Sequence, residues 1–247
     1  MKVVAIIQAR MGSTRLPGKV LRLLAGKTVL AQVIRRARAI TGVDQVVVAT
    51  STRSDDDRVE QEATLNGAEV YRGSESDVLD RYHSAAVKVK AEVVIRITSD
   101  CPLLDSIVVG AMLKRFLAAN ASDEAIDYMS NGLRRTFPRG LDAEIFTREA
   151  LNRAHQGARQ PYEREHVTPY IYQHPESFHI HSFESDKDLS HLRWTLDTEQ
   201  DLQMLTRVFQ GLQSSTDTPS TVEVLEFLRL NPEVATINAE VRQKALE

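Results

Sequence analysis

The first residues that could do chemistry lie at Gln8–Lys19, QARMGSTRLPGK. This stretch holds three cations, Arg10, Arg15 and Lys19, together with glycine and proline and no acidic residue. Guanidinium groups offer paired donors that suit phosphate oxygens, and a lysine ammonium adds a mobile point charge. Glycines allow the backbone to approach a ligand closely, and successive N–H groups can form an anion-binding nest. The stretch therefore predicts a cradle for a triphosphate.

The spacing of the glycines separates this basic loop from two common phosphate-binding motifs. Five residues lie between Gly12 and Gly18, and Val20 follows Lys19. A Walker A loop needs four residues there and Ser or Thr after its lysine, and the G-x-G-x-x-G dinucleotide fingerprint is absent. The plain alternative is a solvated basic loop. A position directly after a buried apolar run favours ligand binding instead, because open α/β sheets bind ligands at that edge.

Two aspartates each follow an apolar run further along the chain. Asp100 comes after VIRITS and Asp197 after LRWTL, and we expect both runs to be strands of one parallel sheet. Both carboxylates would then face the crevice beside the basic loop, where they would repel each other unless a cation lay between them. A triphosphate site needs a metal, and Mg²⁺ takes oxygen ligands. We therefore predict that the pair binds Mg²⁺, although each aspartate alone is also typical of a turn or helix cap.

Strands and helices alternate through about residue 120, which predicts a three-layer, Rossmann-like α/β fold with a mostly parallel sheet. Expected strands lie at residues 3–7, 45–50, 68–72 and 92–98, and expected helices at 28–40, 55–67, 76–90 and 105–119. Thr28 is expected to cap the first helix. Short strands within 127–186 then predict an antiparallel arm, before the sheet resumes with a late strand at Leu192–Thr198 and a helix follows. A polar linker at 214–220 precedes a C-terminal helical tail, 218–247, broken at Asn231–Pro232.

Length, net charge and cysteine content add a few expectations about domain number, partners and location. The chain has 247 residues, a formal net charge of −3 and one cysteine. We expect a single domain over 1–247, no nucleic-acid partner and no internal disulfide. No stretch has the roughly 20 apolar residues of a membrane span, and the apolar run at the N-terminus is too short for a signal peptide. A cytoplasmic location is expected.

For several other polar groups we prefer a structural role to a functional one. The acids of Ser54–Asp57 invite comparison with the D-x-D metal motif of glycosyltransferases, but acids are favoured in a first helical turn. Two imidazoles of His179–His181 share a strand face without a third metal ligand nearby. Cys101 is expected to be a small buried residue rather than a nucleophile. His83 and His166 lie in helical stretches and are expected to be packed or on the surface.

The opening AIIQARMGSTRLPGKVL closely resembles that of nucleotide-sugar cytidylyltransferases, a family that includes the CMP-KDO and CMP-sialic acid synthetases. The cytidylyltransferase-like proteins of spore coat polysaccharide biosynthesis look nearest. The likeness extends through VVVATS, RGSESDVLDRY, RITSDCPLLD, FPRGLDAEIF, YEREHVTPYIY and LRWTLDTEQDL, over roughly residues 3–210, and INAEVRQK in the tail also looks similar. The KDO-type pattern Gln-Gly-Asp-Glu-Pro stands here as Thr98–Pro102, TSDCP, which keeps the aspartate and the proline.

The resemblance implies that a sugar hydroxyl attacks the α-phosphorus of CTP and that pyrophosphate leaves, for surface polysaccharide biosynthesis. Such a reaction needs positioning and charge stabilisation more than covalent help. By resemblance, Lys19 stabilises the α-phosphate, Arg10 stabilises the leaving pyrophosphate, and Asp100 and Asp197 carry Mg²⁺. The nucleotide-binding residues that it implies are Ala9, Arg10, Gly12, Ser13, Arg15, Lys19, Thr50, Ser74 and Thr98. In similar enzymes an arm outside the main sheet builds a two-fold dimer, so we expect 127–186 to be the dimerisation and substrate arm of a homodimer.

The segment FPRGLDAEIF offers groups for the second substrate. Pro138–Gly140 forms a turn that presents Arg139, and Asp142 and Glu144 share one face of a following strand. If the acceptor is a sugar acid, Arg139 would hold its carboxylate, and Asp142 and Glu144 would hold sugar hydroxyls. The aromatic residues of HVTPYIYQ could form core, substrate wall or dimer surface.

Three alternatives stay open at this point. The chain could use another nucleotide or a sugar phosphate as acceptor. It could be a glycosyltransferase that consumes a nucleotide-sugar, because both classes use a nucleotide cradle and a metal on related folds. It could also be an enzyme-like binding protein without turnover.

Overall fold

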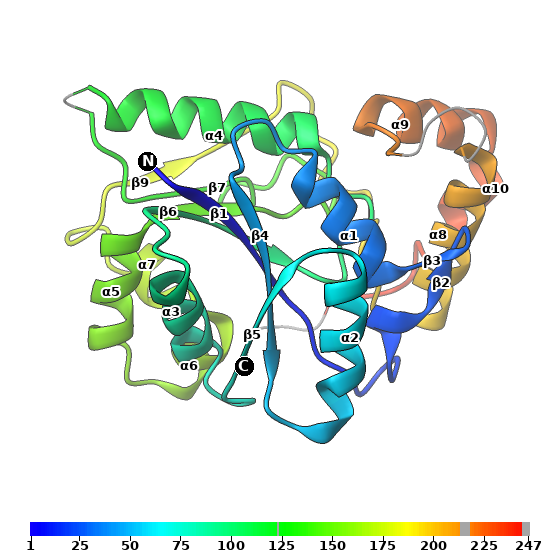
Figure 1. The fold of residues 1–247 in the computed structure, drawn as a ribbon. Helices are drawn as coiled ribbons and strands as arrows, with labels where there is room; N and C mark the ends of the chain where they lie inside the picture. Colours follow the sequence, from blue (N-terminus) through cyan, green and yellow to red (C-terminus); the bar gives the residue numbers. More distant parts are fainter. Residues whose placement is uncertain (123, 213–217, 244–247) are drawn as a thin grey trace.

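The computed structural model describes residues 1–122, 124–212 and 218–243 (Figure 1). In this described part, seven strands form one sheet in the order β5-β4-β1-β6-β8-β7-β9. The strands are β1 (Val3–Gln8), β4 (Gln45–Ser51), β5 (Glu69–Gly73), β6 (Val93–Thr98), β7 (Tyr128–Ser130), β8 (Glu144–Thr147) and β9 (Ile180–Ser182). Strand β8 runs antiparallel to both of its neighbours, and the other adjacent pairs are parallel. The predicted mostly parallel α/β sheet is confirmed.

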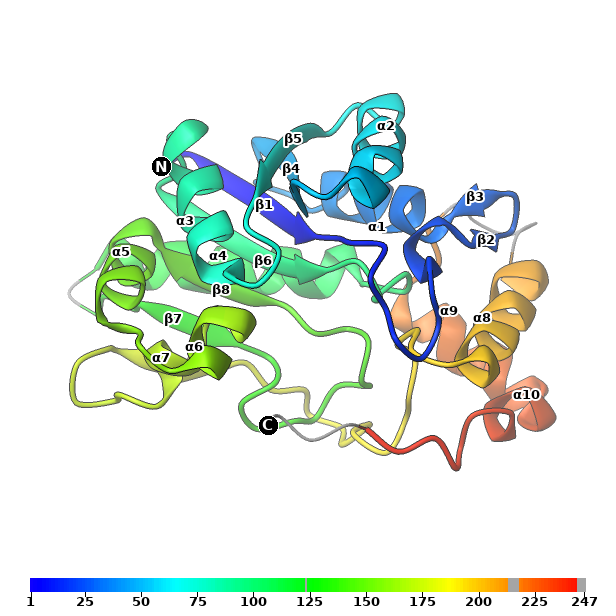
Figure 2. The ribbon, with the colours of Figure 1, turned by 90° about the horizontal axis from the view of Figure 1, so that it is seen from below.

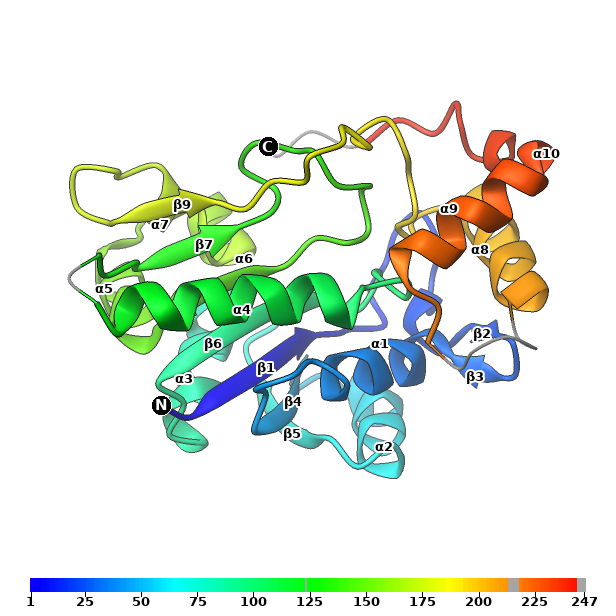
Figure 3. The same cartoon turned by 90° about the horizontal axis from the view of Figure 1, so that it is seen from above.

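Helices cover both faces of this sheet (Figures 1 and 3). They are α1 (Val29–Arg38), α2 (Asp57–Leu65) and α4 (Ser106–Asn120) on one face, and α3 (Val78–Lys88), α5 (Arg148–Gly157), α6 (Pro161–His166) and α7 (Pro169–Tyr172) on the other. In β1, Val3, Ala5 and Ile7 pack with the first group, whereas Val4 and Ile6 pack with α3, α5 and α7. Because side chains alternate along a strand and both faces are covered, the strand reads as one continuous apolar run.

The region 127–186 is not an arm outside the sheet, which corrects that part of the expected organisation. The predicted antiparallel pairing exists, but β8 pairs directly with β6 and β7, and β9 continues the same sheet beyond β7 (Figure 3). Ile145 and Phe146 of β8 are fully buried and pack into the cores on opposite faces of the sheet. A strand that is buried on both faces lies inside a sheet. The sequence did not reveal this position for β8, because the strands of this region are short and long loops separate them.

The segment Leu192–Thr198 is extended but is no strand of the sheet, so the expected late strand is wrong. It makes one isolated bridge, Arg139 with Arg193, and its Leu196 N–H donates to the Asp100 carbonyl at 2.9 Å. The segment therefore crosses the carboxyl end of β6 instead of continuing the sheet. Gly140 makes this crossing possible, because it has φ +106° and a Cβ there would lie 2.5 Å from the Thr195 nitrogen.

A third apolar cluster lies beyond the sheet. Helices α8 (Glu199–Leu212), α9 (Thr221–Leu230) and α10 (Pro232–Thr236) pack there with the small hairpin β2 (Leu23–Leu24) and β3 (Lys27–Thr28) and with Trp194 (Figure 2). The predicted break between two tail helices at Asn231–Pro232 is confirmed. Of the expected linker, residues 214–217 lie outside the described residues. Within the described residues, no helix has the length and apolar character that crossing a membrane demands.

Candidate active site

The basic loop leaves the carboxyl end of β1 and returns to the short 3-10 helix η1 (Lys19–Leu21). The Met11 N–H donates to Asp56 Oδ1 at 2.7 Å, and the Gly18 N–H donates to the Met11 carbonyl at 3.2 Å. Gly18 has φ +64°, a left-handed conformation that glycine adopts without strain. The loop is thus tied at both ends, and Lys19 is fixed at the start of η1. Asp56, one of the acids of Ser54–Asp57, holds the loop in place through this hydrogen bond.

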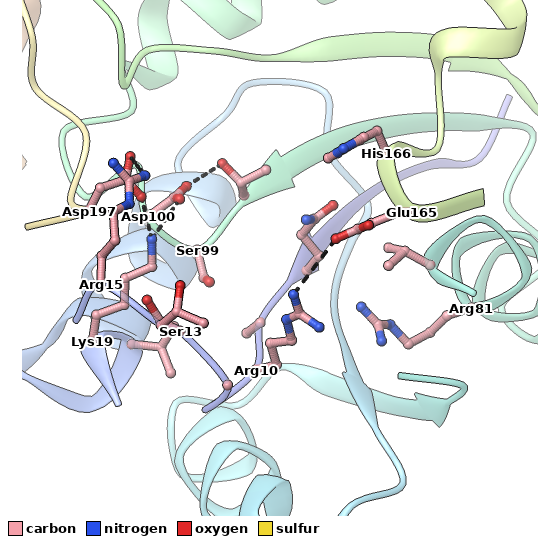
Figure 4. A pocket seen from close by; sticks show the side chains of 17 residues that line it. Arg10, Ser13, Arg15, Lys19, Arg81, Ser99, Asp100, Glu165, His166 and Asp197 are labelled. Atoms are coloured by element: carbon pink, nitrogen blue, oxygen red, sulfur yellow. Dashed lines mark hydrogen bonds and ion pairs between the residues drawn. The ribbon is translucent and has the colours of Figure 1, made fainter. Parts of the chain in front are cut away.

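The loop borders a cavity of about 440 Å³ at the carboxyl ends of β1 and β6 (Figure 4). It brings together nine of the predicted site residues, namely Ala9, Arg10, Gly12, Ser13, Arg15, Lys19, Thr98, Asp100 and Asp197. We call this space the nucleotide cavity. Cations and carboxylates both line it, as suits a charged ligand.

Lys19 lies between the two predicted metal-binding carboxylates (Figure 4). Its Nζ is 2.9 Å from Asp100 Oδ2 and 2.8 Å from Asp197 Oδ1, and it donates to the Leu196 carbonyl at 2.7 Å. Burial alone would lower the pKa of the Lys19 ammonium, but Asp100 and Asp197 outweigh burial and raise that pKa. The ammonium is therefore the cation that allows these two carboxylates to converge.

Asp197 is held by two further cations. Arg15 Nη2 lies 2.9 Å and Arg193 Nη2 3.1 Å from its Oδ2. Burial would raise the pKa of Asp197, but Lys19, Arg15 and Arg193 together hold it below its usual value. The aspartates meet as predicted, although by a different route from the two parallel strands that we expected. Asp100 follows β6, whereas Asp197 arrives on the extended crossing segment.

Two predicted nucleotide-binding residues are not brought to this cavity. The Thr50 side chain is fully buried inside the sheet. The Ser74 hydroxyl accepts from the Asp77 N–H at 3.0 Å, at the start of α3. Neither lines the nucleotide cavity. Thr50 and Ser74 lie in the motifs VVVATS and RGSESDVLDRY, and of the two only Ser74 has a local structural role, at the start of α3.

Eight lining residues lie outside the predicted site set, among them the polar residues Arg81, Ser99, Glu165 and His166, the last of which we had expected to be packed or on the surface. Figure 4 shows Arg81 and Glu165 on the side of the cavity away from Lys19, with Glu165 Oε1 4.0 Å from Arg10 Nη2. Burial lowers the pKa of the Arg81 guanidinium, whose Nη1 donates to the Ser74 carbonyl at 2.7 Å. Burial likewise lowers the pKa of His166. The motifs RGSESDVLDRY, RITSDCPLLD and YEREHVTPYIY contain these four residues, but only the fold brings them to one cavity.

A second cavity, of about 630 Å³, adjoins the first, and Arg15, Thr98, Asp100 and Asp197 line both. Arg139, Asp142 and Glu144 all line it, as do Arg96, Tyr128, Arg135, Tyr172 and Gln243. We call it the acceptor cavity. Four arginines line it, Arg15 included, and they face four carboxylates, so Arg139 is the one of these arginines without an ion pair among the described residues. Tyr172 belongs to the HVTPYIYQ stretch, whose place the sequence left open.

Asp142 and Glu144, the two acids that line the acceptor cavity alone, are already paired. Asp142 Oδ1 lies 2.5 Å from Arg135 Nη2, and its Oδ2 accepts from the Gly140 N–H at 2.8 Å. Glu144 accepts from Arg96, from the Tyr128 hydroxyl at 2.5 Å and from the Thr168 hydroxyl at 2.7 Å. Both carboxylates therefore organise the cavity wall. Arg139 is half-buried, and burial together with nearby Arg135 lowers its pKa.

The remaining candidates lie as follows. Cys101 is buried beside Thr98, and burial raises the pKa of its thiol well above the usual value, which disfavours a thiolate nucleophile. His83 stacks on His155 with ring centroids 4.1 Å apart, away from the cavity lining. Among the described residues, no three His, Cys, Asp or Glu side chains gather as a metal cluster.

Comparisons with known proteins show the family of this chain. The cytidylyltransferase family model matches residues 4–237. The Bacillus subtilis spore coat polysaccharide biosynthesis protein SpsF is 33% identical, with 95% of this chain and 97% of that protein covered. The 3-deoxy-manno-octulosonate cytidylyltransferase of Anaeromyxobacter dehalogenans is 34% identical, with 69% of this chain and 73% of that protein covered.

Solved structures of cytidylyltransferases are also similar to this chain. A cytidylyltransferase from Leptospira borgpetersenii is similar over 99% of both chains, with 35% identity and a TM-score of 0.89. A CMP:2-keto-3-deoxy-manno-octonic acid synthetase complexed with CTP shares the fold over 87% of this chain and all of that chain, with 23% identity and a TM-score of 0.65. With the family model matching nearly the whole chain, this protein belongs to the cytidylyltransferase family.

Proposed function

We propose that this enzyme transfers CMP from CTP to a sugar acid of the sialic, pseudaminic or KDO type and releases pyrophosphate, for surface polysaccharide biosynthesis. One observation carries the proposal: the nucleotide and acceptor cavities meet at a shared wall that includes Arg15, Asp100 and Asp197. Because the two cavities adjoin, a hydroxyl bound in the acceptor cavity would lie next to a phosphate bound in the nucleotide cavity, as a transfer reaction needs.

The chain's own residues supply binding and charge on the nucleotide side. Arg10 and Arg15, with the backbone N–H groups around Gly12 and Ser13, bind the triphosphate. Lys19 stabilises the charge that develops at the α-phosphate, because its ammonium is held at the wall between the cavities. Arg10, whose nearest acids lie at 4.0 Å, turns to the leaving pyrophosphate.

The same wall fits Mg²⁺. Asp100 and Asp197 present oxygen donors to one point, and Mg²⁺ commonly uses one or two carboxylates together with substrate phosphates and waters. When bound, the ion would neutralise charge on the phosphates during transfer. Asp100 and Asp197 would hold it, and Lys19 would then turn from the carboxylates to the phosphate.

The acceptor side favours an acidic sugar. Arg139 and Arg135 lie on its wall, and the carboxylates of Asp142 and Glu144 are already satisfied by arginines of the chain. An acceptor carboxylate would therefore bind Arg139, while the Tyr128 and Tyr172 side of the cavity faces the sugar ring.

The test is an assay of pyrophosphate release with CTP, Mg²⁺ and a panel of sugar acids, sugar phosphates and neutral sugars. We expect release with at least one sugar acid. Release only with a sugar phosphate, or only with another nucleoside triphosphate, would replace the proposed acceptor or donor. Tight CTP binding without release, or consumption of a CMP-sugar without pyrophosphate, would instead favour a binding protein or a glycosyltransferase.

We further propose that the enzyme acts as a homodimer, as its resemblance to the nucleotide-sugar cytidylyltransferases implies. Light scattering at micromolar concentration tests this, and a monomer would contradict it.

A further inference from the structure

The last described residues of the chain return to the active site. After α10, residues 238–243 run alongside the segment that precedes α8 (Figures 2 and 3). We call them the C-terminal strap. Gln243, which belongs to the tail stretch INAEVRQK, lines the acceptor cavity together with Arg139 and Asp197.

Asn238 anchors the strap inside the protein. Its side chain is 3% exposed, and its Nδ2 donates to Asp201 Oδ1 at 2.8 Å and to the Arg193 carbonyl at 3.1 Å. Asp201 is fully buried and also accepts from the Asp197 N–H at 2.9 Å. An asparagine amide at this position therefore fixes the carboxylate that in turn fixes the backbone of Asp197.

Arg193 connects the strap to the reacting end of the site. Its Nε and Nη2 bind Asp201 at 2.9 and 3.0 Å, and Nη2 also donates to Asp197 Oδ2 at 3.1 Å. Its Nη1 donates to Gln243 Oε1 at 2.8 Å. One guanidinium thus orients an active-site carboxylate and a side chain on the acceptor wall, and its fixed fork couples their positions.

We propose that the C-terminal strap completes the acceptor site: Gln243 contacts the acceptor and tunes its selection, and Asn238 is a positioning residue that acts through Asp201 and Arg193 on Asp197. The acceptor half of this statement rests on the proposed function. The Gln243 carbonyl oxygen is engaged by Arg193, which leaves its amide N–H₂ oriented as a donor for an acceptor hydroxyl or carboxylate oxygen.

The test compares Gln243→Ala, Gln243→Glu and Asn238→Ala with wild type and with Arg242→Ala, an exposed neighbour outside the acceptor lining. For each protein, kcat and both KM values are measured by pyrophosphate release with the best acceptor found. Acceptor binding in the presence of CTP is also measured, as the shift in Tm that each compound of the panel causes.

We expect Gln243→Ala to raise the acceptor KM about five- to tenfold, the range of one lost hydrogen bond, with the CTP KM unchanged. Gln243→Glu keeps an oxygen for Arg193 but adds a negative charge, so it should impair carboxylate acceptors more than neutral sugars. Asn238→Ala should lower kcat about tenfold or more with little change in the CTP KM, because Asp197 loses its orientation. Arg242→Ala should match wild type.

Failure of the strap and failure of the proposed function give different results. If no sugar acid is accepted but another compound is, the proposed acceptor class fails, and the same variants test the strap with that compound. Gln243 variants that match Arg242→Ala in every acceptor parameter would overturn its contact role. An Asn238→Ala protein that loses Tm but keeps wild-type kcat below its melting range would overturn the positioning role. A panel in which no compound gives release or a Tm shift with wild type would count against both proposals.

Discussion

Replacing Lys19 by methionine removes one positive charge while the length of the side chain is kept. In the wild-type protein the Nζ lies 2.9 Å from Asp100 Oδ2 and 2.8 Å from Asp197 Oδ1. At an effective permittivity of about 20, each pair at such a distance attracts by about 6 kcal/mol before desolvation. Burial of the three charged groups cancels much of this attraction. The net loss of unfolding free energy depends on which cations and water molecules still contact the two carboxylates after the substitution.

In Lys19→Met, both carboxylates still have groups that stabilise their negative charge. Asp197 retains Arg15 and Arg193, and the Asp100 side chain is 26% exposed and can be hydrated. We therefore expect the free energy of unfolding at neutral pH to fall by about 1–3 kcal/mol. Urea denaturation monitored by circular dichroism measures it. An unchanged unfolding free energy would refute the view that Lys19 holds the two carboxylates together.

The pH dependence of this loss has a definite sign. The wild-type pKa of Asp197 is depressed, so its stabilising contribution is present above the ordinary carboxyl pKa and disappears as the pH falls through the depressed value. The stability difference between wild type and Lys19→Met should therefore be largest near neutral pH and shrink in acid. A difference that stays constant down to acid pH would contradict the charge pairing.

The same variant separates catalysis from binding. If the ammonium acts mainly on the transition state, kcat should fall about a hundredfold or more, by analogy with the loss of other charge-stabilising donors. The CTP dissociation constant, measured by calorimetry, should change much less. Equal turnover in wild type and Lys19→Met would remove Lys19 from the catalytic residues.

Three further outcomes are expected. Asp100→Asn and Asp197→Asn should each abolish most turnover, and the double variant should be little worse, because the two act as a unit; independent, multiplicative losses in a double-mutant cycle would argue against a shared ion. Gly140→Ala should lower the free energy of unfolding by about 3 kcal/mol, since φ is +106° and the new Cβ would lie 2.5 Å from the Thr195 nitrogen; a wild-type urea curve would contradict the close crossing. Arg139→Gln should raise the KM of a carboxylate acceptor about tenfold in the pyrophosphate assay and leave neutral sugars unaffected, and equal effects on both would refute its role.

The nucleotide half of the fold could be predicted because its information is local. Each unit there is a short strand followed by a helix, and the first helix has its own cap, because the Thr28 hydroxyl accepts from the Ala31 N–H at 3.0 Å. The basic loop lies inside the first such unit. Its residue types, the preceding strand and the following helix were therefore all visible within one stretch.

The acceptor half could be predicted only in part, because its geometry depends on distant partners. Arg96 reads as one polar residue in an apolar strand, and its direction is set by Glu144, 48 residues later. Gln243 and Arg193 are 50 residues apart and meet only after the crossing segment and the tail have packed. Apolar periodicity carries no information about such pairs. The same limit explains why the antiparallel strands of 127–186 were not expected inside the main sheet and why a late strand was wrongly expected.

The crossing segment at Leu192–Thr198 also has a consequence for how the chain folds. Residues 1–120 consist of strand–helix units whose contacts close short loops, so they form early at low entropic cost. The Leu196 contact with Asp100 joins residues far apart in sequence, and the Thr221 contact with Asp105 spans 116 residues. Those closures come late, after the parallel core exists. During synthesis, the triphosphate cradle is therefore expected to take shape before the ribosome has delivered Asp197, and phosphoryl-transfer competence arrives with the last segments of the chain.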